Sequence, residues 1–210
     1  MTELVHSKAE KYADDFTTAD GDLLLEVADH TIKNHSMPHM LSGHVQGRLL
    51  SMLSCLVKPE RILEIGTFTG YSALCLAEGL QDKGVLHTID IRDEGAAVFF
   101  DRSAFKNKIV LHIGDANKII PELTESWDIV FIDADKTGYL NYYELILPQL
   151  KINGLIIVDN VLFHGDVLED NITGKNAKAI HAFNEHIKND KRVEQVLLTV
   201  RDGLLLLRKI

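Results

Sequence analysis

Four polar side chains in the second half of the chain have the types and spacing of a catalytic metal centre. Asp133 and Lys136 follow the apolar run DIVFI, and Asp159 and Asn160 follow the apolar run GLIIV. Carboxylate and amide oxygens are ligands that Mg²⁺, Mn²⁺ and Ca²⁺ prefer, and a lysine beside them could act as a base. Acids at the ends of parallel strands face a ligand crevice at the carboxyl edge of a sheet. The pattern therefore predicts a metal-dependent enzyme.

Such a centre needs neighbouring parallel strands, and the chain from residue 61 onward has the pattern that supplies them. Apolar runs of strand length alternate with helical segments, which is typical of a parallel sheet with helices on both faces. Strands are expected at 61–66, 85–90, 108–115, 128–135 and 154–160. Helices are expected at 71–80, 94–105, 117–123, 137–150 and 176–190.

The two ends of the chain depart from this alternation. Residues 1–57 predict only helices, near 3–15, 20–34 and 41–56, and Asp20 is expected to cap the second of them. Near the other end, Asp202-Gly203 lies between the apolar runs 192–200 and 203–210, which is a strong signal for an antiparallel hairpin. The sequence thus predicts one α/β domain over residues 1–210, with a helical cap and a mostly parallel sheet that ends in a hairpin.

The turn after the first expected strand is EIGTFTGYS, residues 64–72, and its glycines would let the chain pass close to a ligand. Asp90 ends the second strand, where a carboxylate can accept hydrogen bonds from both hydroxyls of a ribose. The loop lacks the G-x-G-x-x-G of dinucleotide enzymes and the G-K-[ST] of phosphate-binding loops. A nucleoside without a pyrophosphate, such as S-adenosylmethionine, is therefore the expected ligand, although glycines also occur in such turns for geometry alone.

Composition narrows the class of protein and its surroundings. The 210 residues are 46% hydrophobic and 25% charged, and they carry a net charge of −9. This acidic balance disfavours nucleic acid and anionic membrane surfaces as partners. The sequence contains no apolar run of about 18 residues, the length that spans a membrane, and no secretory signal is recognisable. A cytoplasmic location is therefore expected. Cys55 and Cys75 lie in apolar helical patterns and are expected to be buried free thiols.

Together these motifs resemble the cation-dependent class I O-methyltransferases, the group that contains caffeoyl-CoA and catechol O-methyltransferases. The resemblance covers about residues 35–210 and is most specific in FIDADKTGYLNYY (131–143) and DNVLFHGDV (159–167). It implies a Rossmann-like class I methyltransferase fold with a seven-stranded sheet. It also implies a divalent-metal-dependent enzyme that transfers a methyl group from S-adenosylmethionine to a hydroxyl of a small, catechol-like aromatic acceptor.

The resemblance implies roles for individual residues as well. Asp133, Asp159 and Asn160 are implied to bind the cation, which would be Mg²⁺, or Mn²⁺ or Ca²⁺ in its place. Lys136 is implied to be the general base, with Asp133 beside it in the catalytic centre. A homodimer is also suggested. The residues implied to contact the cofactor are Met40, Ser42, Glu64, Gly66, Thr67, Ser72, Asp90, Asp115, Ala116 and Asp133.

The chain departs from the family at positions that concern the acceptor. Phe163 stands where plant members tend to carry a tryptophan against the substrate ring, and His44 stands where the family often has an acid. The features with which plant enzymes hold the coenzyme A tail are not recognisable. His164, just after the Asp159-Asn160 pair, is expected to line the acceptor pocket. The acceptor could be a free catechol, a phenylpropanoid, a flavonoid or a CoA ester.

Simpler roles compete for several of these residues. Lys136 could merely form an ion pair with Asp133 or Asp135, and Asp159-Asn160 could be an ordinary turn. Tyr139, Tyr142 and Tyr143 are expected to pack a helix against the sheet. An NAD-dependent oxidoreductase and a metabolite-binding module without turnover stay open as alternatives.

Overall fold

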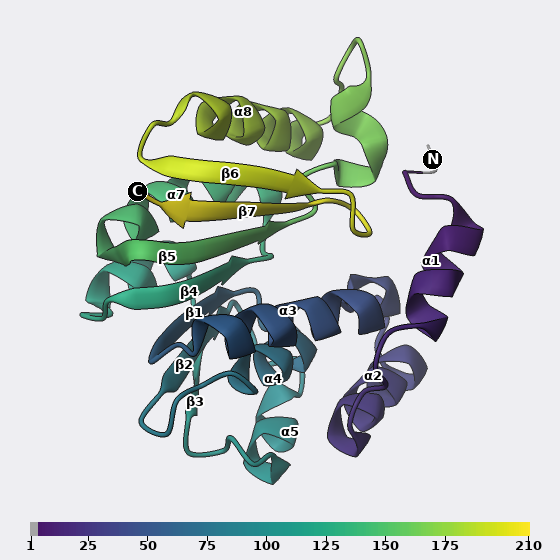
Figure 1. Cartoon of the computed structure of the whole chain (residues 1–210), viewed down its shortest axis with the longest axis vertical. Coiled ribbons are helices and arrows are strands. Elements are labelled where there is room, and N and C mark those ends of the chain that lie inside the picture. The colour runs from purple at the N-terminus through teal and green to yellow at the C-terminus, as the bar shows by residue number, and fades with distance from the viewer. Residues whose placement is uncertain (1–3) are drawn as a thin grey trace.

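A seven-stranded sheet forms the centre of the molecule, and the computed structural model describes residues 4–210 around it. The strand order is β3-β2-β1-β4-β5-β7-β6. The first five strands in the chain pair in parallel, whereas β7 runs antiparallel to both β5 and β6. The bounds are β1 Arg61–Ile65, β2 Val85–Asp90, β3 Ile109–Ile113, β4 Trp127–Ile132, β5 Leu150–Asp159, β6 Val193–Leu198 and β7 Leu204–Lys209. The predicted mostly parallel sheet with a terminal antiparallel hairpin is confirmed (Figure 1).

Helices cover both faces of the sheet, because successive residues of its central strands point to opposite sides. Ile62 packs in one core and Leu63 in the other. One face is covered by α2 (Asp22–Asn34), α3 (His44–Val57), α4 (Tyr71–Ala77) and α5 (Ala96–Arg102), whose side chains share one core (Figure 1). The other is covered by α6 (Ala116–Ile119), α7 (Tyr139–Ile146) and α8 (Lys175–Asn189). Helix α1 (Ser7–Asp15) has no buried residue.

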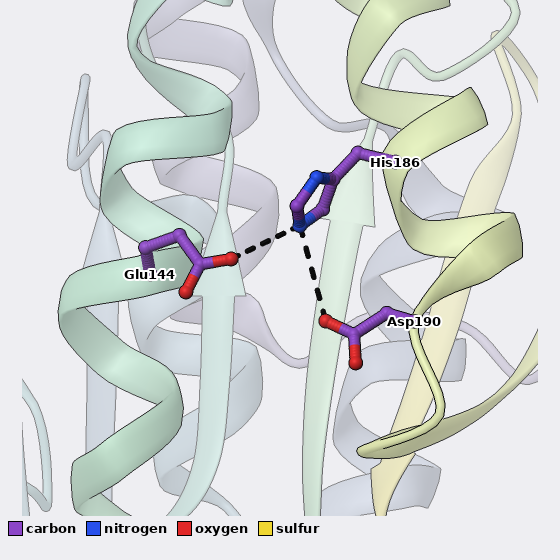
Figure 2. Close-up of side chains that lie close together, drawn as sticks. All are labelled: Glu144, His186 and Asp190. Carbon is purple, nitrogen blue, oxygen red and sulfur yellow. Dashed lines mark hydrogen bonds and ion pairs between the residues drawn. The ribbon is translucent and has the colours of Figure 1, made fainter.

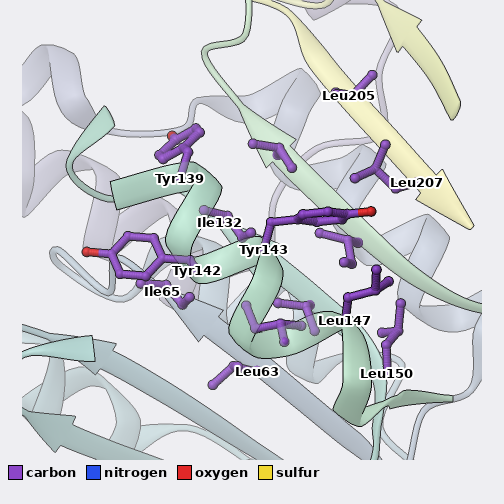
Figure 3. Close-up of a cluster of buried hydrophobic side chains, with 14 of the residues drawn as sticks. Leu63, Ile65, Ile132, Tyr139, Tyr142, Tyr143, Leu147, Leu150, Leu205 and Leu207 are labelled. Atoms are coloured by element: carbon purple, nitrogen blue, oxygen red, sulfur yellow. The ribbon is translucent and has the colours of Figure 1, made fainter. Parts of the chain in front are cut away.

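The tyrosines of α7 belong to the second core, as predicted. Tyr139, Tyr142 and Tyr143 are all buried, and Figure 3 shows them among leucine and isoleucine side chains of the sheet. The hydroxyls of these tyrosines each donate a hydrogen bond at the margin of that core. Helix α7 is therefore fixed to the sheet by apolar packing and by polar contacts at its rim.

Element boundaries differ from the predicted ones mainly where turns begin. Strand β4 ends at Ile132, so the acids at 133 and 135 lie in the following loop. The helix expected at 137–150 is α7 flanked by 3-10 turns at Lys136–Gly138 and Leu147–Gln149. Strand β5 starts earlier than expected, at Leu150. Residue 3 of the first expected helix lies outside the described residues.

Two predictions for single residues are wrong. Asp20 does not cap α2, whose N-cap is Gly21. Instead the Asp20 carboxylate is buried, accepts a hydrogen bond from the Tyr71 hydroxyl at 2.6 Å and pairs with Arg48 at 3.1 Å. Cys55 is exposed whereas Cys75 is buried, because Cys55 follows the inward-facing Ser54 and points away from the sheet on α3.

Within residues 4–210, no helix combines the length and the apolar character needed to cross a bilayer.

Candidate active site

A cavity of about 750 Å³ opens where the carboxyl ends of the parallel strands meet. Its walls include the loops that follow β1, β2, β3, β4 and β5, together with the segment before α3 and the turn between β6 and β7. Of the residues predicted to bind the cofactor or the cation, or to act as the general base, all but Glu64 line this cavity. They are Met40, Ser42, Gly66, Thr67, Ser72, Asp90, Asp115, Ala116, Asp133, Lys136, Asp159 and Asn160.

The glycine loop after β1 passes against the backbone of Asp133. Gly66 has a φ of +106°, and a Cβ built on it would lie 1.9 Å from the Asp133 carbonyl oxygen. The Asp133 N–H donates to the Ile65 carbonyl at 2.8 Å. Only glycine allows this contact, so the loop expected to hold the cofactor is joined directly to the loop that carries the acids.

Asp90 ends β2 and faces the cavity beside that loop. Its Oδ2 accepts the Phe68 N–H at 2.8 Å, and its Oδ1 accepts the Ile91 N–H at 2.7 Å. These two bonds fix the orientation of the carboxylate in the wall of the cavity. Each oxygen keeps a second lone pair for a ligand hydroxyl.

Glu64 lies beneath the cavity rather than in its wall. The side chain is 0% exposed, and its two carboxylate oxygens accept hydrogen bonds from the hydroxyls of Ser72 and Thr88. Burial raises the pKa of Glu64 to about 8. Glu64 thus supports Ser72, which does line the cavity, and a direct contact of Glu64 with the cofactor stays a prediction.

Lys136 is held by two short contacts in the 3-10 turn that precedes α7. Its Nζ donates to Asp133 Oδ1 at 2.8 Å and to the Tyr139 hydroxyl at 2.7 Å. The Tyr139 hydroxyl in turn donates to the main-chain carbonyl of Asp159 at 3.1 Å. Asp135 is exposed and accepts hydrogen bonds from Tyr142 and Thr137 instead. Of the two ion pairs considered for Lys136, the structure forms the one with Asp133.

Asp159 is the most deeply buried carboxylate in the cavity wall, with 3% of its surface exposed. Its Oδ2 accepts a hydrogen bond from Gln46 of α3 at 2.6 Å, and its Oδ1 accepts the Asn160 N–H at 2.7 Å. Burial, together with the nearby charge of Asp133, raises the pKa of Asp159 above its ordinary range. Ile132 and Val158 are register partners in β4 and β5, so the two acids that follow them are neighbours at the edge of the sheet.

Asn160 adopts a left-handed conformation, with a φ of +58°, which asparagine tolerates better than most residues. Its amide nitrogen donates to Asp202 Oδ2 at 3.2 Å. The other Asp202 oxygen accepts the His164 N–H at 2.6 Å. The β6–β7 turn therefore orients Asn160, and the Asn160 side-chain oxygen, Oδ1, is left to coordinate a cation.

Sequence reasoning missed Gln46 and assigned Asp202 only to a turn. Gln46 is 0% exposed, and its Oε1 has no hydrogen-bond partner among the described residues. A glutamine within the apolar stripe of α3 was the available signal, since a buried amide needs a polar partner. Nothing near Asp202 in the sequence indicates that it would contact Asn160.

The donor set fits a divalent cation. Asp133, Asp159 and Asn160 offer two carboxylates and one amide oxygen, the hard ligands that Mg²⁺, Mn²⁺ and Ca²⁺ take. The two carboxylates lie close enough for one to raise the pKa of the other. A cation between them would remove this repulsion.

A second group of possible metal ligands lies away from the cavity, between α7 and α8. Glu144, His186 and Asp190 have ligand atoms within 4.8 Å of one another (Figure 2). Arg192 already pairs with both carboxylates of this group, at 2.7 Å from Glu144 and 2.6 Å from Asp190. A guanidinium that neutralises both acids makes this group an ion-pair network that joins the two helices.

Comparison with known proteins decides the family. The family model described as O-methyltransferase matches residues 14–210. The chain belongs to the O-methyltransferase family. A probable caffeoyl-CoA O-methyltransferase 2 of Dictyostelium discoideum is 36% identical over 208 residues, which cover 95% of this chain and 90% of that protein. A catechol O-methyltransferase of Niastella koreensis is 30% identical, covering 94% of this chain and 92% of its own length.

Solved structures in the same family have the same fold. The O-methyltransferase TomG of Streptomyces achromogenes, involved in tomaymycin synthesis and solved in complex with SAM, superposes with a TM-score of 0.88. It is 28% identical, and 96% of each chain is covered. The predicted family, the class I methyltransferase fold and the predicted enzyme class are thereby confirmed. The alternative of an NAD-dependent oxidoreductase is wrong.

Proposed function

We propose that this O-methyltransferase transfers a methyl group from S-adenosylmethionine to one hydroxyl of a small vicinal dihydroxy aromatic, with the help of a divalent cation. One observation carries the proposal. Asp133, Lys136, Asp159 and Asn160 line the same cavity as the glycine loop and Asp90. A cofactor site and an oxygen-ligand site in one cavity are what metal-assisted methyl transfer requires.

The proposed cation ligands are Asp133, Asp159 and Asn160. A bound divalent cation would lower the pKa of a phenol that coordinates it and hold the two oxygens of a catechol. Two carboxylates and a neutral amide leave net positive charge on a dication for a phenolate. The burial of Asp159 and the bonds from Gln46 and the Asn160 N–H fix the most enclosed ligand in one orientation.

Lys136 is the proposed proton acceptor, at Nζ, in its neutral amine form. A dication held beside it would favour this form over the ammonium that pairs with Asp133. The amine lies in the cavity wall and is fixed by the Asp133 carboxylate and the Tyr139 hydroxyl. Tyr139 cannot itself serve as the base, because its side chain is 0% exposed and burial raises the pKa of its hydroxyl well above the ordinary value. Tyr139 instead orients the Lys136 amine toward the acid loop.

The proposed cofactor site is the part of the cavity lined by the glycine loop and by the residues at the ends of β2 and β3. Asp90, with both oxygens already oriented by main-chain N–H groups, would accept the ribose hydroxyls. Asp115 and Ala116 after β3 would border the adenine. SAM in the complex of TomG supports this assignment of the cofactor. A homodimer and a cytoplasmic location remain part of the proposal.

Removal of the metal tests the proposed function. The purified protein is incubated with S-adenosylmethionine and 4-methylcatechol in two parallel reactions, one with Mg²⁺ and one with excess EDTA. EDTA should abolish methyl transfer, and added Mg²⁺ should restore it. Full turnover in EDTA would reject the role of the cation.

A variant provides a second readout that does not depend on turnover. Asp159→Ala should lose Mg²⁺ binding in calorimetric titration while its circular dichroism spectrum stays that of a folded protein. Glu194→Gln is the matched control, because Glu194 is an exposed acid that pairs with Arg208 on the hairpin. Equal Mg²⁺ affinity in both variants would count against the proposed ligand set.

A further inference from the structure

One positively charged side chain in the cavity wall has no carboxylate partner. Arg92, Lys136 and Arg201 all line the cavity. Arg92 pairs with Glu94, and Lys136 pairs with Asp133. Within residues 4–210, Arg201 is the one arginine for which no carboxylate lies within 4.0 Å. Its charge is therefore not neutralised by an ion pair within these residues.

Arg201 is an exposed residue of the cavity wall, and its neighbour in sequence contacts a proposed cation ligand. Arg201 lies in the β6–β7 turn, directly before Asp202, whose carboxylate binds the side chain of Asn160 and the N–H of His164. One Arg201 guanidinium nitrogen, Nη1, donates to the Leu41 carbonyl at 2.8 Å. This bond holds the guanidinium between the turn and the segment before α3. It uses one of the five guanidinium N–H donors, so the others can bind a ligand.

The rest of this end of the cavity is acidic. Asp133, Asp135, Asp159 and Asp202 contribute carboxylates, and Lys136 is paired with the first of them. An acceptor that carries a negative group would be repelled here unless a cation met it. A guanidinium presents its donors in a planar fork that matches carboxylate and phosphate oxygens.

We propose that Arg201 binds an anionic group, a carboxylate or a phosphate, carried by the dihydroxy aromatic acceptor. The inference rests on the proposed function, because it adds to the acceptor of that same site. It narrows the substrate class from catechols in general to catechols with an acidic substituent. Arg201 acts in binding and specificity and takes no part in proton transfer.

Steady-state kinetics with matched acceptors test the proposal. The acceptors are 4-methylcatechol, which is neutral, 3,4-dihydroxybenzoate, which carries a carboxylate, and caffeoyl-CoA, which carries phosphates. Arg201→Gln should raise KM for an acidic acceptor about tenfold and change KM for the neutral one less than about twofold. Arg201→Lys, which keeps the charge and loses the fork, should fall between. A rise in KM for caffeoyl-CoA alone would identify phosphate as the group that Arg201 binds. A rise in KM for 3,4-dihydroxybenzoate alone would identify a carboxylate.

Arg208→Gln is the control variant, because Arg208 is an exposed arginine on β7 that pairs with Glu194. It should leave the KM values for all three acceptors unchanged. Added salt should weaken the binding of the acidic acceptors only, and only in proteins that keep Arg201. If Arg201→Gln changes KM for acidic and neutral acceptors alike, or for neither, the proposal is wrong.

Calorimetry separates failure of this inference from failure of the proposed function. Each acceptor is titrated into the protein loaded with S-adenosylhomocysteine and Mg²⁺. The inference is supported if binding of an acidic acceptor is lost in Arg201→Gln and kept in Arg208→Gln. This holds even if no acceptor is methylated, because the absence of methylation would reject only the proposed reaction. The inference is overturned if the acidic acceptors bind with equal affinity to all variants, or if they bind to none of them, even if 4-methylcatechol is methylated.

Discussion

Replacing Glu64 with glutamine tests the electrostatics beneath the cofactor wall. Burial raises the pKa of Glu64 from an ordinary value of 4.5 to about 8, so the folded protein keeps a proton that the unfolded chain releases. The contribution of Glu64 to the free energy of unfolding should therefore be greatest below about pH 4.5 and decrease as the pH rises toward 8. Each pH unit in that range is worth about 1.4 kcal/mol, which gives a decrease of about 3.5 kcal/mol between pH 5 and pH 8.

Glu64→Gln keeps the shape of the side chain and removes its titration. The amide can accept a hydrogen bond from one of the Ser72 and Thr88 hydroxyls and donate to the other. The variant should match the wild type at pH 5 and be more stable by about 3.5 kcal/mol at pH 8. Urea unfolding followed by circular dichroism at pH 5, 6, 7 and 8 measures the free energy of unfolding of both proteins. The contributions of all other titrating groups cancel in the difference between the two.

Parallel stability profiles for the two proteins would refute this reasoning, because they would mean that Glu64 is ionised in the folded state. The same variant also tests the cofactor contact that the family resemblance implies. If Glu64 only supports Ser72, calorimetric affinity for S-adenosylhomocysteine should change less than about threefold. A loss of tenfold or more would indicate a direct contact.

Three further substitutions have defined outcomes. Gln46→Met removes the hydrogen bond to Asp159 and should weaken Mg²⁺ binding, measured by calorimetry, about tenfold to a hundredfold; an unchanged affinity would show that Gln46 does not orient this ligand. Gly66→Ala would force a Cβ onto the Asp133 carbonyl oxygen and should cost at least about 3 kcal/mol in thermal denaturation, whereas near-wild-type stability would contradict the described close approach. Arg192→Met leaves the acids between α7 and α8 without their cation and should lower stability by about 1 kcal/mol at neutral pH and low salt, with the difference shrinking in 1 M NaCl; a salt-independent loss would point to packing instead.

Residue patterns were sufficient to predict the sheet and most of its ligand edge. The alternation of apolar runs and helical segments identifies β1 to β5, because a parallel strand buried on both faces reads as a continuous apolar run. The acids at the carboxyl ends of β4 and β5 then lie at one edge of the sheet by register alone. Asp202-Gly203 predicts the hairpin through the conformations that a tight turn requires.

Contacts between distant segments could not be predicted in this way. Gln46 reaches Asp159 across 113 positions of sequence, and its role depends on how α3 crosses the sheet. Cys55 was wrongly expected to be buried, since an apolar helix with neighbours on one side has an outer face that composition does not reveal. Glu64 was expected at the cofactor, and this contact stays a prediction. The structure adds that the Glu64 carboxylate is buried and accepts hydrogen bonds from Ser72 and Thr88, which the sequence did not indicate.

The Leu41–Arg201 contact and the Asp159–Gln46 contact differ in burial, because Arg201 is exposed whereas Asp159 and Gln46 are buried. The proposed chemistry depends on side chains at the ends of central strands, whereas the proposed acceptor contact comes from a surface turn. Substitution at such a turn disturbs little of the core, so evolution could exchange one acceptor for another while the reaction centre is preserved. A lineage built on this plan can diversify its substrates without having to reinvent its catalysis.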